Sequence, residues 1–240
     1  MKICVAQTKS EIGNIKVNIE NHLRWITRAV TEKTDLIVFP ELSLLGYEPK
    51  LAKALATDQN DLRLDVFQEM SNTNKIAIGI GLPTHSEAGI LISMVIFQPH
   101  LPRQTYSKQI LHLDEKKYFI EGNKQTILTL KDAKIALAVC FESLQPQHTA
   151  NAYAMGATVY LASVAKSQLG IEKANAYFPK VARKYSTPIL MANSIGYCDN
   201  FQSAGQTSIW DANGYRIGQL NSQSEGLLIY DTISKSILRI

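Results

Sequence analysis

The stretch Asp35-Leu-Ile-Val-Phe-Pro-Glu41 decides the fold of this chain, because it places a wholly apolar run directly before a carboxylate. The run Leu36–Phe39 is short and has no polar face, which predicts a β-strand buried on both sides in an α/β protein. An unpaired buried charge costs several kcal/mol. We therefore expect Glu41 to have a partner or a chemical task, although a surface glutamate that opens a loop is the plainer alternative.

Strands and helices alternate along the rest of the chain, with hairpins between them. Apolar residues recur with a helical period in Asn18–Glu32, and Asp211-Ala-Asn-Gly214 is typical of a hairpin turn. The expected helices are Asn18–Glu32, Leu62–Ser71, Thr149–Met155 and Glu172–Lys184. The expected strands are Lys2–Gln7, Leu36–Phe39, Ile76–Gly81, Ile90–Gln98, Thr105–Lys108, Thr126–Leu130, Ile135–Val139, Thr158–Ser163, Ile189–Asn193, Ser208–Trp210, Tyr215–Gln219 and Leu227–Tyr230.

This mixture of hairpins and crossovers predicts a layered α/β fold and argues against a purely parallel, doubly wound sheet. No linker or low-complexity segment divides residues 1–240, so we expect a single domain.

The composition is that of a compact protein, with 45% hydrophobic and 19% charged residues among 240. The net charge is +4 and the basic residues are spread along the chain. We expect no nucleic-acid partner, because such a partner needs a concentrated basic stripe. No apolar run reaches the roughly 18 residues of a membrane span, and the N-terminus lacks the pattern of a signal peptide. We therefore expect no membrane association and a cytoplasmic location.

The three cysteines, Cys4, Cys140 and Cys198, are an odd number without close pairing, which indicates reduced thiols. No spacing of cysteines or histidines is typical of a metal site, so we expect neither a metal nor another cofactor. We expect Cys4 to pack within its strand and Cys198 to lie in a loop.

Cys140 ends a second apolar stretch, Ile135-Ala-Leu-Ala-Val-Cys140. A thiol at the end of a buried strand can gain thiolate character from the N-terminus of the next helix. The alternative is a small cysteine packed in the core, as free cysteines commonly are.

Lys108 follows a tyrosine in Tyr106-Ser-Lys108, and alone it would pass for a solvated strand residue. Together with Glu41 and Cys140 it completes a base, an anion-stabilising cation and a nucleophile. Such a set is sufficient for acyl transfer through a thioester.

The surroundings of these three residues resemble the three motifs of the nitrilase superfamily, the carbon–nitrogen hydrolases with a Glu-Lys-Cys catalytic set. The similar strings are Phe39-Pro-Glu-Leu-x-x-x-Gly-Tyr47, Tyr106-Ser-Lys-Gln-Ile-Leu111 and Ala138-Val-Cys-Phe-Glu142, and the resemblance extends over almost the whole chain. The resemblance implies a four-layer α-β-β-α sandwich of two mixed sheets with helices on the outer faces. It also implies a homodimer or a higher homo-oligomer.

The resemblance implies a role for each residue of the set. Glu41 would be the general base and Cys140 the nucleophile, and Lys108 and the backbone N–H of Phe141 would stabilise the oxyanion. Glu115 would be a supporting glutamate that orients the lysine and the substrate.

The sequence offers further candidate positions around these three residues. Asp114 and Glu121 are close alternatives to Glu115 in this stretch of the chain. The substrate-pocket candidates, each with a structural alternative such as core packing or helix capping, are Tyr47, Tyr118, Glu142 and Asn193. In the superfamily pattern Asn193 and the turn Gly205–Ser208 support the site, and here Gln206-Thr207 replaces smaller residues.

We therefore expect a cofactor-independent thiol hydrolase of non-peptide carbon–nitrogen bonds. Its substrate would be a small-molecule amide, cleaved through a Cys140 thioester with release of ammonia or an amine. A nitrile hydrolase or an N-carbamoyl hydrolase would use the same three residues. A catalytically silent binding module is the alternative from another class, and the intact set argues against it.

Two other branches of the superfamily fit this sequence less well. Lipoprotein N-acyltransferases need transmembrane helices and glutamine-dependent synthetases need a fused ATP-using domain, and this sequence contains neither. We expect the choice of substrate to depend on loops such as Ala165–Gly170.

Overall fold

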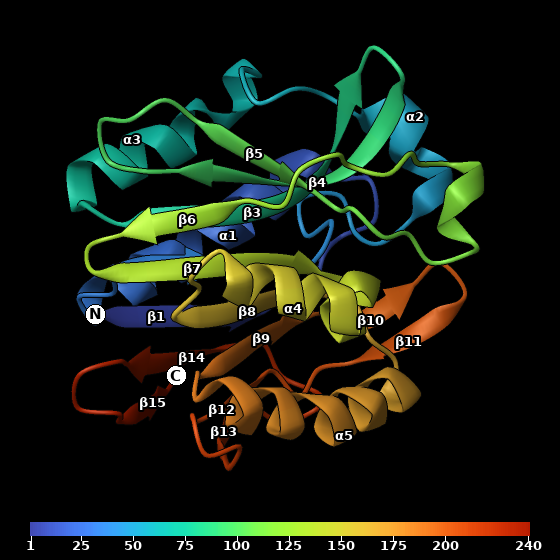
Figure 1. Ribbon diagram of the computed structural model, residues 1–240. Coiled ribbons are helices and arrows are strands. Elements are labelled where there is room, and N and C mark those ends of the chain that lie inside the picture. Colours follow the sequence, from blue (N-terminus) through green and yellow to red (C-terminus); the bar gives the residue numbers. More distant parts are fainter.

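The computed structural model describes residues 1–240 and contains two β-sheets stacked face to face, with helices on both outer faces (Figure 1). Seven strands of the first sheet follow the order β15-β14-β1-β2-β3-β4-β5, and six strands of the second follow the order β13-β12-β9-β8-β7-β6. Each sheet contains parallel and antiparallel neighbours. The expected four-layer sandwich of two mixed sheets is therefore confirmed.

The elements have the following bounds. The first sheet contains β1 (Lys2–Gln7), β2 (Leu36–Val38), β3 (Ala77–Ser86), β4 (Gly89–Phe97), β5 (Gln104–Ser107), β14 (Gly226–Asp231) and β15 (Ile237–Arg239). The second contains β6 (Ile127–Leu130), β7 (Ala133–Val139), β8 (Val159–Val164), β9 (Ile189–Asn193), β12 (Ser208–Trp210) and β13 (Arg216–Gln219). The α-helices are α1 (Ile15–Thr31), α2 (Ala52–Leu55), α3 (Asp65–Asn74), α4 (Pro146–Ala154) and α5 (Gln168–Tyr185). The short 3-10 helices are η1 (Pro49–Leu51), η2 (Leu62–Leu64), η3 (Glu115–Lys117) and η4 (Cys140–Leu144).

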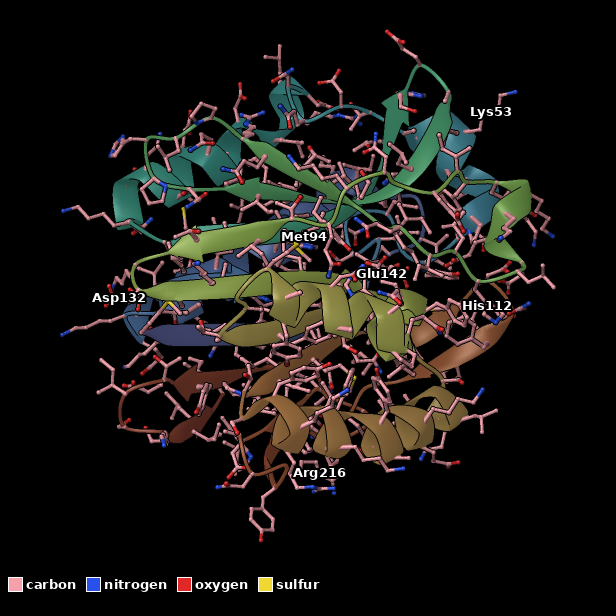
Figure 2. All side chains as sticks on the ribbon, viewed as in Figure 1. Lys53, Met94, His112, Asp132, Glu142 and Arg216 are labelled. Carbon is pink, nitrogen blue, oxygen red and sulfur yellow. The ribbon has the colours of Figure 1, made fainter.

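The four layers follow from the alternation of side chains along each strand, since neighbouring residues point to opposite faces of a sheet. On β7, Leu137 packs between the two sheets, whereas Ala136 and Ala138 pack against the layer of α4 and α5. On β1, Cys4 faces the opposite outer layer, formed by α1 and α3. Figure 2 shows Met94 of β4 in the core between the sheets.

The four expected helices are present, and α1, α4 and α5 start earlier than their apolar periods indicated, whereas the expected helix Leu62–Ser71 begins as the 3-10 helix η2 and becomes α-helical at Asp65. The helix α1 begins at Ile15 because the side chain of Asn14 caps it and accepts a hydrogen bond from the N–H of Val17. The helix α4 begins at Pro146, a residue that suits the first turn of a helix because it needs no N–H partner there. Both starts depend on polar or proline residues that an apolar period does not include.

Three short strands were not expected, and one cysteine lies elsewhere than expected. The strands β10 (Ile195–Cys198) and β11 (Phe201–Ala204) form a separate hairpin, and β15 adds an edge to the first sheet. The prediction of a loop position for Cys198 is wrong, because this residue ends β10 and is 4% exposed. The hairpin brings its side chain inward, beside the hydroxyl of Ser194.

None of the helices is long and apolar enough to cross a membrane. The two ends of the chain lie on the same side of the molecule, at the left of Figure 1. The candidate site lies at the opposite end, where the parallel strands finish.

Candidate active site

The candidate site lies beyond the carboxyl ends of the parallel strands, at the right of Figure 1. The strands β1, β2 and β3 run parallel in the first sheet, and β7, β8 and β9 run parallel in the second. In α/β proteins the loops that follow parallel strands lie together at the carboxyl ends of those strands, where ligands commonly bind. The loops after β2 and β8 and the helix η4 after β7 bring Glu41, Lys166 and Cys140 to one place.

Glu41 follows β2 and is 2% exposed. Its loop lies tightly against β3, where a Cβ added to Gly81 would be 2.5 Å from the backbone N of Leu42. Across the gap between the sheets, the hydroxyl of Ser163 on β8 donates a 2.8 Å hydrogen bond to the carbonyl of Phe39. The Glu41 carboxylate is thus fixed by both sheets, and its Oε2 atom is buried without a hydrogen-bond partner.

Lys108 follows β5 and is completely buried between two carboxylates. Its Nζ donates to Glu41 Oε1 at 2.8 Å and to Glu115 Oε1 at 2.6 Å. Glu115 also accepts hydrogen bonds from the Tyr47 hydroxyl at 2.7 Å and from the N–H of His112 at 2.7 Å. An ammonium has three N–H groups, so one remains for a further acceptor.

Of the three acidic candidates in this stretch, Glu115 is the one whose carboxylate lies against Lys108. Asp114 instead contacts the ring of His112, and Glu121 lies near Lys116 on the surface. The position of Glu115 on η3 turns its side chain inward, where it is 1% exposed.

Cys140 begins η4 directly after β7 and has a backbone φ of 47°. This left-handed conformation is uncommon for a residue with a side chain and is a form of local strain that occurs at functional sites. It turns the chain sharply between strand and helix. The thiol Sγ lies 3.5 Å from the carbonyl oxygen of Ala165, in the loop after β8.

The three groups influence each other's pKa values. Burial raises the pKa of Glu41 above its ordinary range, and Lys108 opposes this shift. Burial alone would lower the pKa of Lys108, but the charges of Glu41 and Glu115 outweigh it and raise that pKa. Burial and the charge of Glu41 raise the pKa of the Cys140 thiol to about 12. The thiol therefore keeps its proton until a base accepts it.

A cavity of about 540 Å³ opens in front of Cys140. Its lining residues are Tyr47, His112, Asp114, Glu115, Cys140, Phe141, Leu144, Gln145, Ala165, Lys166, Ser167, Leu169, Gly170, Lys173, Tyr177 and Phe201. Glu41 and Lys108 are not part of this lining and lie buried behind it. The volume suits a small molecule, since ligand cavities commonly measure about 300–1,000 Å³.

Tyr47 lines this cavity, whereas the other three expected pocket residues do not. Tyr118 lies beside a separate, smaller cavity and packs under Lys117, whose Nζ is 4.8 Å from the ring centroid. Asn193 is completely buried behind the wall of the cavity. Its side chain accepts from the N–H of Lys166 at 2.8 Å and donates to the carbonyl of Lys166 at 3.2 Å. Asn193 therefore supports the loop after β8.

Glu142 is likewise not in contact with the cavity. Glu142 is completely buried and lies near the middle of the view in Figure 2, whereas His112, which lines the cavity, lies at the right. Its carboxylate accepts hydrogen bonds from the Tyr106 hydroxyl at 2.6 Å, the N–H of Val139 at 2.7 Å and the N–H of Gln109 at 2.6 Å. Burial raises the pKa of Glu142 to about 7, against the effect of these donors. Glu142 thus ties the loop after β5 to the end of β7.

Lys166 was not among the predicted site residues, although it lies in the expected loop Ala165–Gly170, lines the cavity and is 6% exposed. Its Nζ donates to the carbonyl oxygen of Cys140 at 3.3 Å and lies 4.0 Å from Cys140 Sγ. A usable signal was present, because Lys166 follows the apolar strand β8 much as Glu41 follows β2. A charged residue beyond a buried strand is the same pattern in both cases.

No group of three or more histidine, cysteine, aspartate or glutamate side chains is arranged to hold a metal ion. The groups gathered here are two buried carboxylates, two lysines and a thiol.

Comparison with known proteins agrees with this geometry. Residues 2–237 match the model of the carbon–nitrogen hydrolase family, and the chain belongs to that family. An amidase from Nesterenkonia sp. AN1 has a similar structure, with a TM-score of 0.87 at 22% identity, over 96% of this chain and 92% of that one. Another structure of that amidase, described as a member of the nitrilase superfamily, also superposes with a TM-score of 0.87. The resemblance to the nitrilase superfamily is confirmed.

Curated relatives include two kinds of protein. A glutamine-dependent NAD(+) synthetase from Acinetobacter baylyi is 28% identical over 144 residues, which are 58% of this chain and 26% of that protein. The corresponding synthetase from Thermotoga maritima is 22% identical over 100% of this chain and 43% of its own length. An (R)-stereoselective amidase from Pseudomonas sp. is 24% identical over 67% of this chain and 59% of its own length. The chain thus spans less than two thirds of the length of these relatives.

Proposed function

We propose that this protein is an amidase that hydrolyses a small amide through a thioester on Cys140. The observation that carries the proposal is the buried Glu41–Lys108–Glu115 cluster beside a strained cysteine at the wall of a cavity. Membership of the carbon–nitrogen hydrolase family supports an enzyme that acts on carbon–nitrogen bonds other than peptide bonds. The amidases among the similar proteins favour an amide over a nitrile or a carbamoyl compound.

The first half of the proposed reaction forms the thioester. Glu41 Oε2, the oxygen without a partner, accepts the proton of the Cys140 thiol as Sγ attacks the carbonyl carbon. The negative charge moves to the carbonyl oxygen, where the free N–H of Lys108 and the backbone N–H of Phe141 stabilise it. One such donor typically contributes about 2.7–4 kcal/mol to the barrier. The carbon–nitrogen bond then breaks, and Glu41 returns its proton to the departing nitrogen.

The second half of the reaction releases the acid. Glu41 takes a proton from water, and the resulting hydroxide attacks the thioester carbon, again with an oxyanion beside Lys108. The carbon–sulfur bond breaks, the proton returns to Cys140 Sγ, and the carboxylic acid leaves the cavity. The same carboxylate serves as base and acid in turn, which requires a pKa nearer neutrality than that of an exposed glutamate. The raised pKa of Glu41 supports this role.

The side-chain amide of glutamine is a second candidate substrate. The Thermotoga maritima relative, which matches the whole chain, is a glutamine-dependent NAD(+) synthetase. In this case the chain would release ammonia from glutamine by the same steps at Cys140.

The proposal is tested by ammonia release from a panel of aliphatic amides, glutamine, nitriles and N-carbamoyl compounds. The Cys140→Ala protein should show no turnover of any of them, while Cys198→Ala, which alters another buried thiol, should keep most of the activity. Mass spectrometry of the acid-quenched wild-type enzyme should detect the acyl adduct on Cys140. Substantial hydrolysis by folded Cys140→Ala protein would falsify the mechanism.

A further inference from the structure

Lys166 is a buried cation that the proposed reaction does not use. It is 6% exposed, and no carboxylate lies within 4.0 Å of its Nζ, whereas the other buried lysine of the site, Lys108, contacts two. A buried ammonium without an opposite charge is unfavourable. The nearest group that can become negative is the thiol of Cys140, with Sγ 4.0 Å from Nζ.

The structure holds Lys166 at this distance through its backbone and its side-chain stem. The side-chain amide of Asn193 bonds both the N–H and the carbonyl of Lys166, at 2.8 and 3.2 Å, and the N–H of Ala204 donates to the same carbonyl at 2.9 Å. Gly170 lies against the stem, where an added Cβ would be 3.0 Å from the Cβ of Lys166. These contacts restrict the side chain of Lys166 and hold its ammonium near Cys140.

The charges around Cys140 are asymmetric before the reaction. Glu41 and Lys108 form one ion pair behind the cavity, and Lys166 stands on the sulfur side without a counter-charge. When the thiol proton moves to Glu41, the negative charge leaves the carboxylate beside Lys108 and appears on the sulfur beside Lys166. The charge of Lys166 lowers the pKa of Cys140, and it does so more strongly than the charge of Lys108.

We propose that Lys166 is a second catalytic cation, which stabilises the thiolate of Cys140 as Glu41 takes its proton, and that Asn193 positions Lys166 for this purpose. The inference rests on the proposed role of Cys140 as nucleophile. In the step concerned, one proton moves from Sγ to Glu41 Oε2 and the electron pair stays on sulfur, while Lys166 keeps its own proton. Lys166 contributes charge and no proton transfer.

The experiment measures the rate at which iodoacetamide alkylates Cys140 as a function of pH, with peptide mapping to separate Cys140 from Cys4 and Cys198. Every variant retains the other titratable groups that act on Cys140 or line its cavity, which are Glu41, Lys108, Glu115, Tyr47, His112, Asp114, Lys173 and Tyr177. At each pH the Lys166→Met protein should be alkylated about tenfold or more slowly, which corresponds to a profile displaced to higher pH by about one unit or more. Lys166→Arg should restore most of the wild-type profile. The control Lys180→Met removes an exposed lysine of α5 that lies outside the cavity, and it should leave the profile unchanged.

A Lys166→Met protein that is folded by circular dichroism and has the wild-type profile would overturn the proposal. The proposal would also fail if Lys166→Met slowed alkylation by the anionic iodoacetate but left alkylation by the neutral iodoacetamide unchanged at every pH. Lys166 would then bind an anionic group of the substrate. The Asn193→Ala protein should shift the profile in the same direction by a smaller amount. If the shift occurs but no amide, glutamine included, is hydrolysed, the thiolate role holds and the proposed amidase activity fails.

Discussion

At the scale of single residues, the site is a small group of charges whose positions decide what each can do. Lys108 lies between Glu41 and Glu115, and each of these carboxylates keeps the ammonium ionised. Glu41 Oε1 accepts a hydrogen bond from Lys108, and Oε2 has no hydrogen-bond partner. An oxygen without a partner is what a proton acceptor needs. A buried ion pair contributes little net stability, so we attribute this cluster to catalysis.

The first prediction concerns the pH dependence of Glu41. Glu41 must be ionised to accept the thiol proton, and burial raises its pKa. As the pH decreases, kcat should therefore fall with an apparent pKa above the ordinary range of a glutamate. Glu41→Gln should abolish turnover, and Glu41→Asp should retain about one hundredth of it, since a displacement of about 1 Å can cost roughly 10²-fold. The measurement is kcat against pH for the three proteins. Comparable turnover by Glu41→Gln would show that Glu41 is not the base.

The second prediction concerns Lys108. Arginine carries the same charge on a planar fork, which does not fit a completely buried site where Nζ lies 2.6 and 2.8 Å from two carboxylates. Lys108→Arg and Lys108→Met should therefore both lower kcat by a factor on the order of 10² or more. The control Lys116→Arg alters an exposed lysine nearby and should have no effect. Near-normal kcat in Lys108→Arg would make the lysine structural.

At the scale of elements, the site depends on connections between strand ends that are distant in sequence. Glu142 on η4 accepts hydrogen bonds from Val139 at the end of β7 and from Gln109 after β5. It thereby fixes the separation between the two segments that carry Cys140 and Lys108. The groups that donate hydrogen bonds to the Glu142 carboxylate hold it in the interior beneath the site, away from the cavity.

The third prediction follows from these bonds. Glu142→Gln places an amide N–H₂ where the carboxylate accepted N–H and O–H donors, so at least one buried donor loses its partner, at about 1–3 kcal/mol. A chain of this size should lose roughly 2–12 °C in Tm, and kcat should fall with it because Lys108 and Cys140 move apart. Thermal denaturation and turnover are measured beside Glu121→Gln, a surface control. An unchanged Tm would mean that Glu142 contributes nothing to this connection.

At the scale of the whole molecule, the largest core lies between the sheets and contains residues from both. Each outer layer adds a smaller core, with Trp25 on the side of α1 and Trp210 on the side of α5. Neither sheet can lose its partner without exposing the shared core. Residues 1–240 should therefore unfold as one unit.

The fourth prediction tests this cooperativity with the two tryptophans. In Trp25→Phe and in Trp210→Phe, the fluorescence of the remaining tryptophan reports one outer layer only. In each variant, urea should change the fluorescence and the far-UV circular dichroism with the same midpoint, as a two-state domain requires. Two separate midpoints within one variant would show that the layers unfold independently and that the single-domain prediction is wrong.

The predicted homodimer is checked on the same samples by light scattering.

The sequence determined most of the strands, the longer helices and the types of residue at the site, because these depend on local patterns, whereas the short strands β10, β11 and β15 were not predicted. Apolar runs such as Leu36–Phe39 and Ile135–Val139 identify buried strands from their own residues. Glu41 and Cys140 stand directly after such runs, so their positions at strand ends could be predicted without knowing the partner sheet.

Only the tertiary structure decided which side chains meet. The donors to Glu142 and the contact between Lys166 and Cys140 depend on the register of β7 and β8 and on how the two sheets stack. No local period contains that information, because Glu41 and Lys108 are separated by 67 residues and meet only after both sheets have formed. The same reason explains the supporting position of Asn193, whose side chain bonds Lys166 and Gly205 in other segments of the chain.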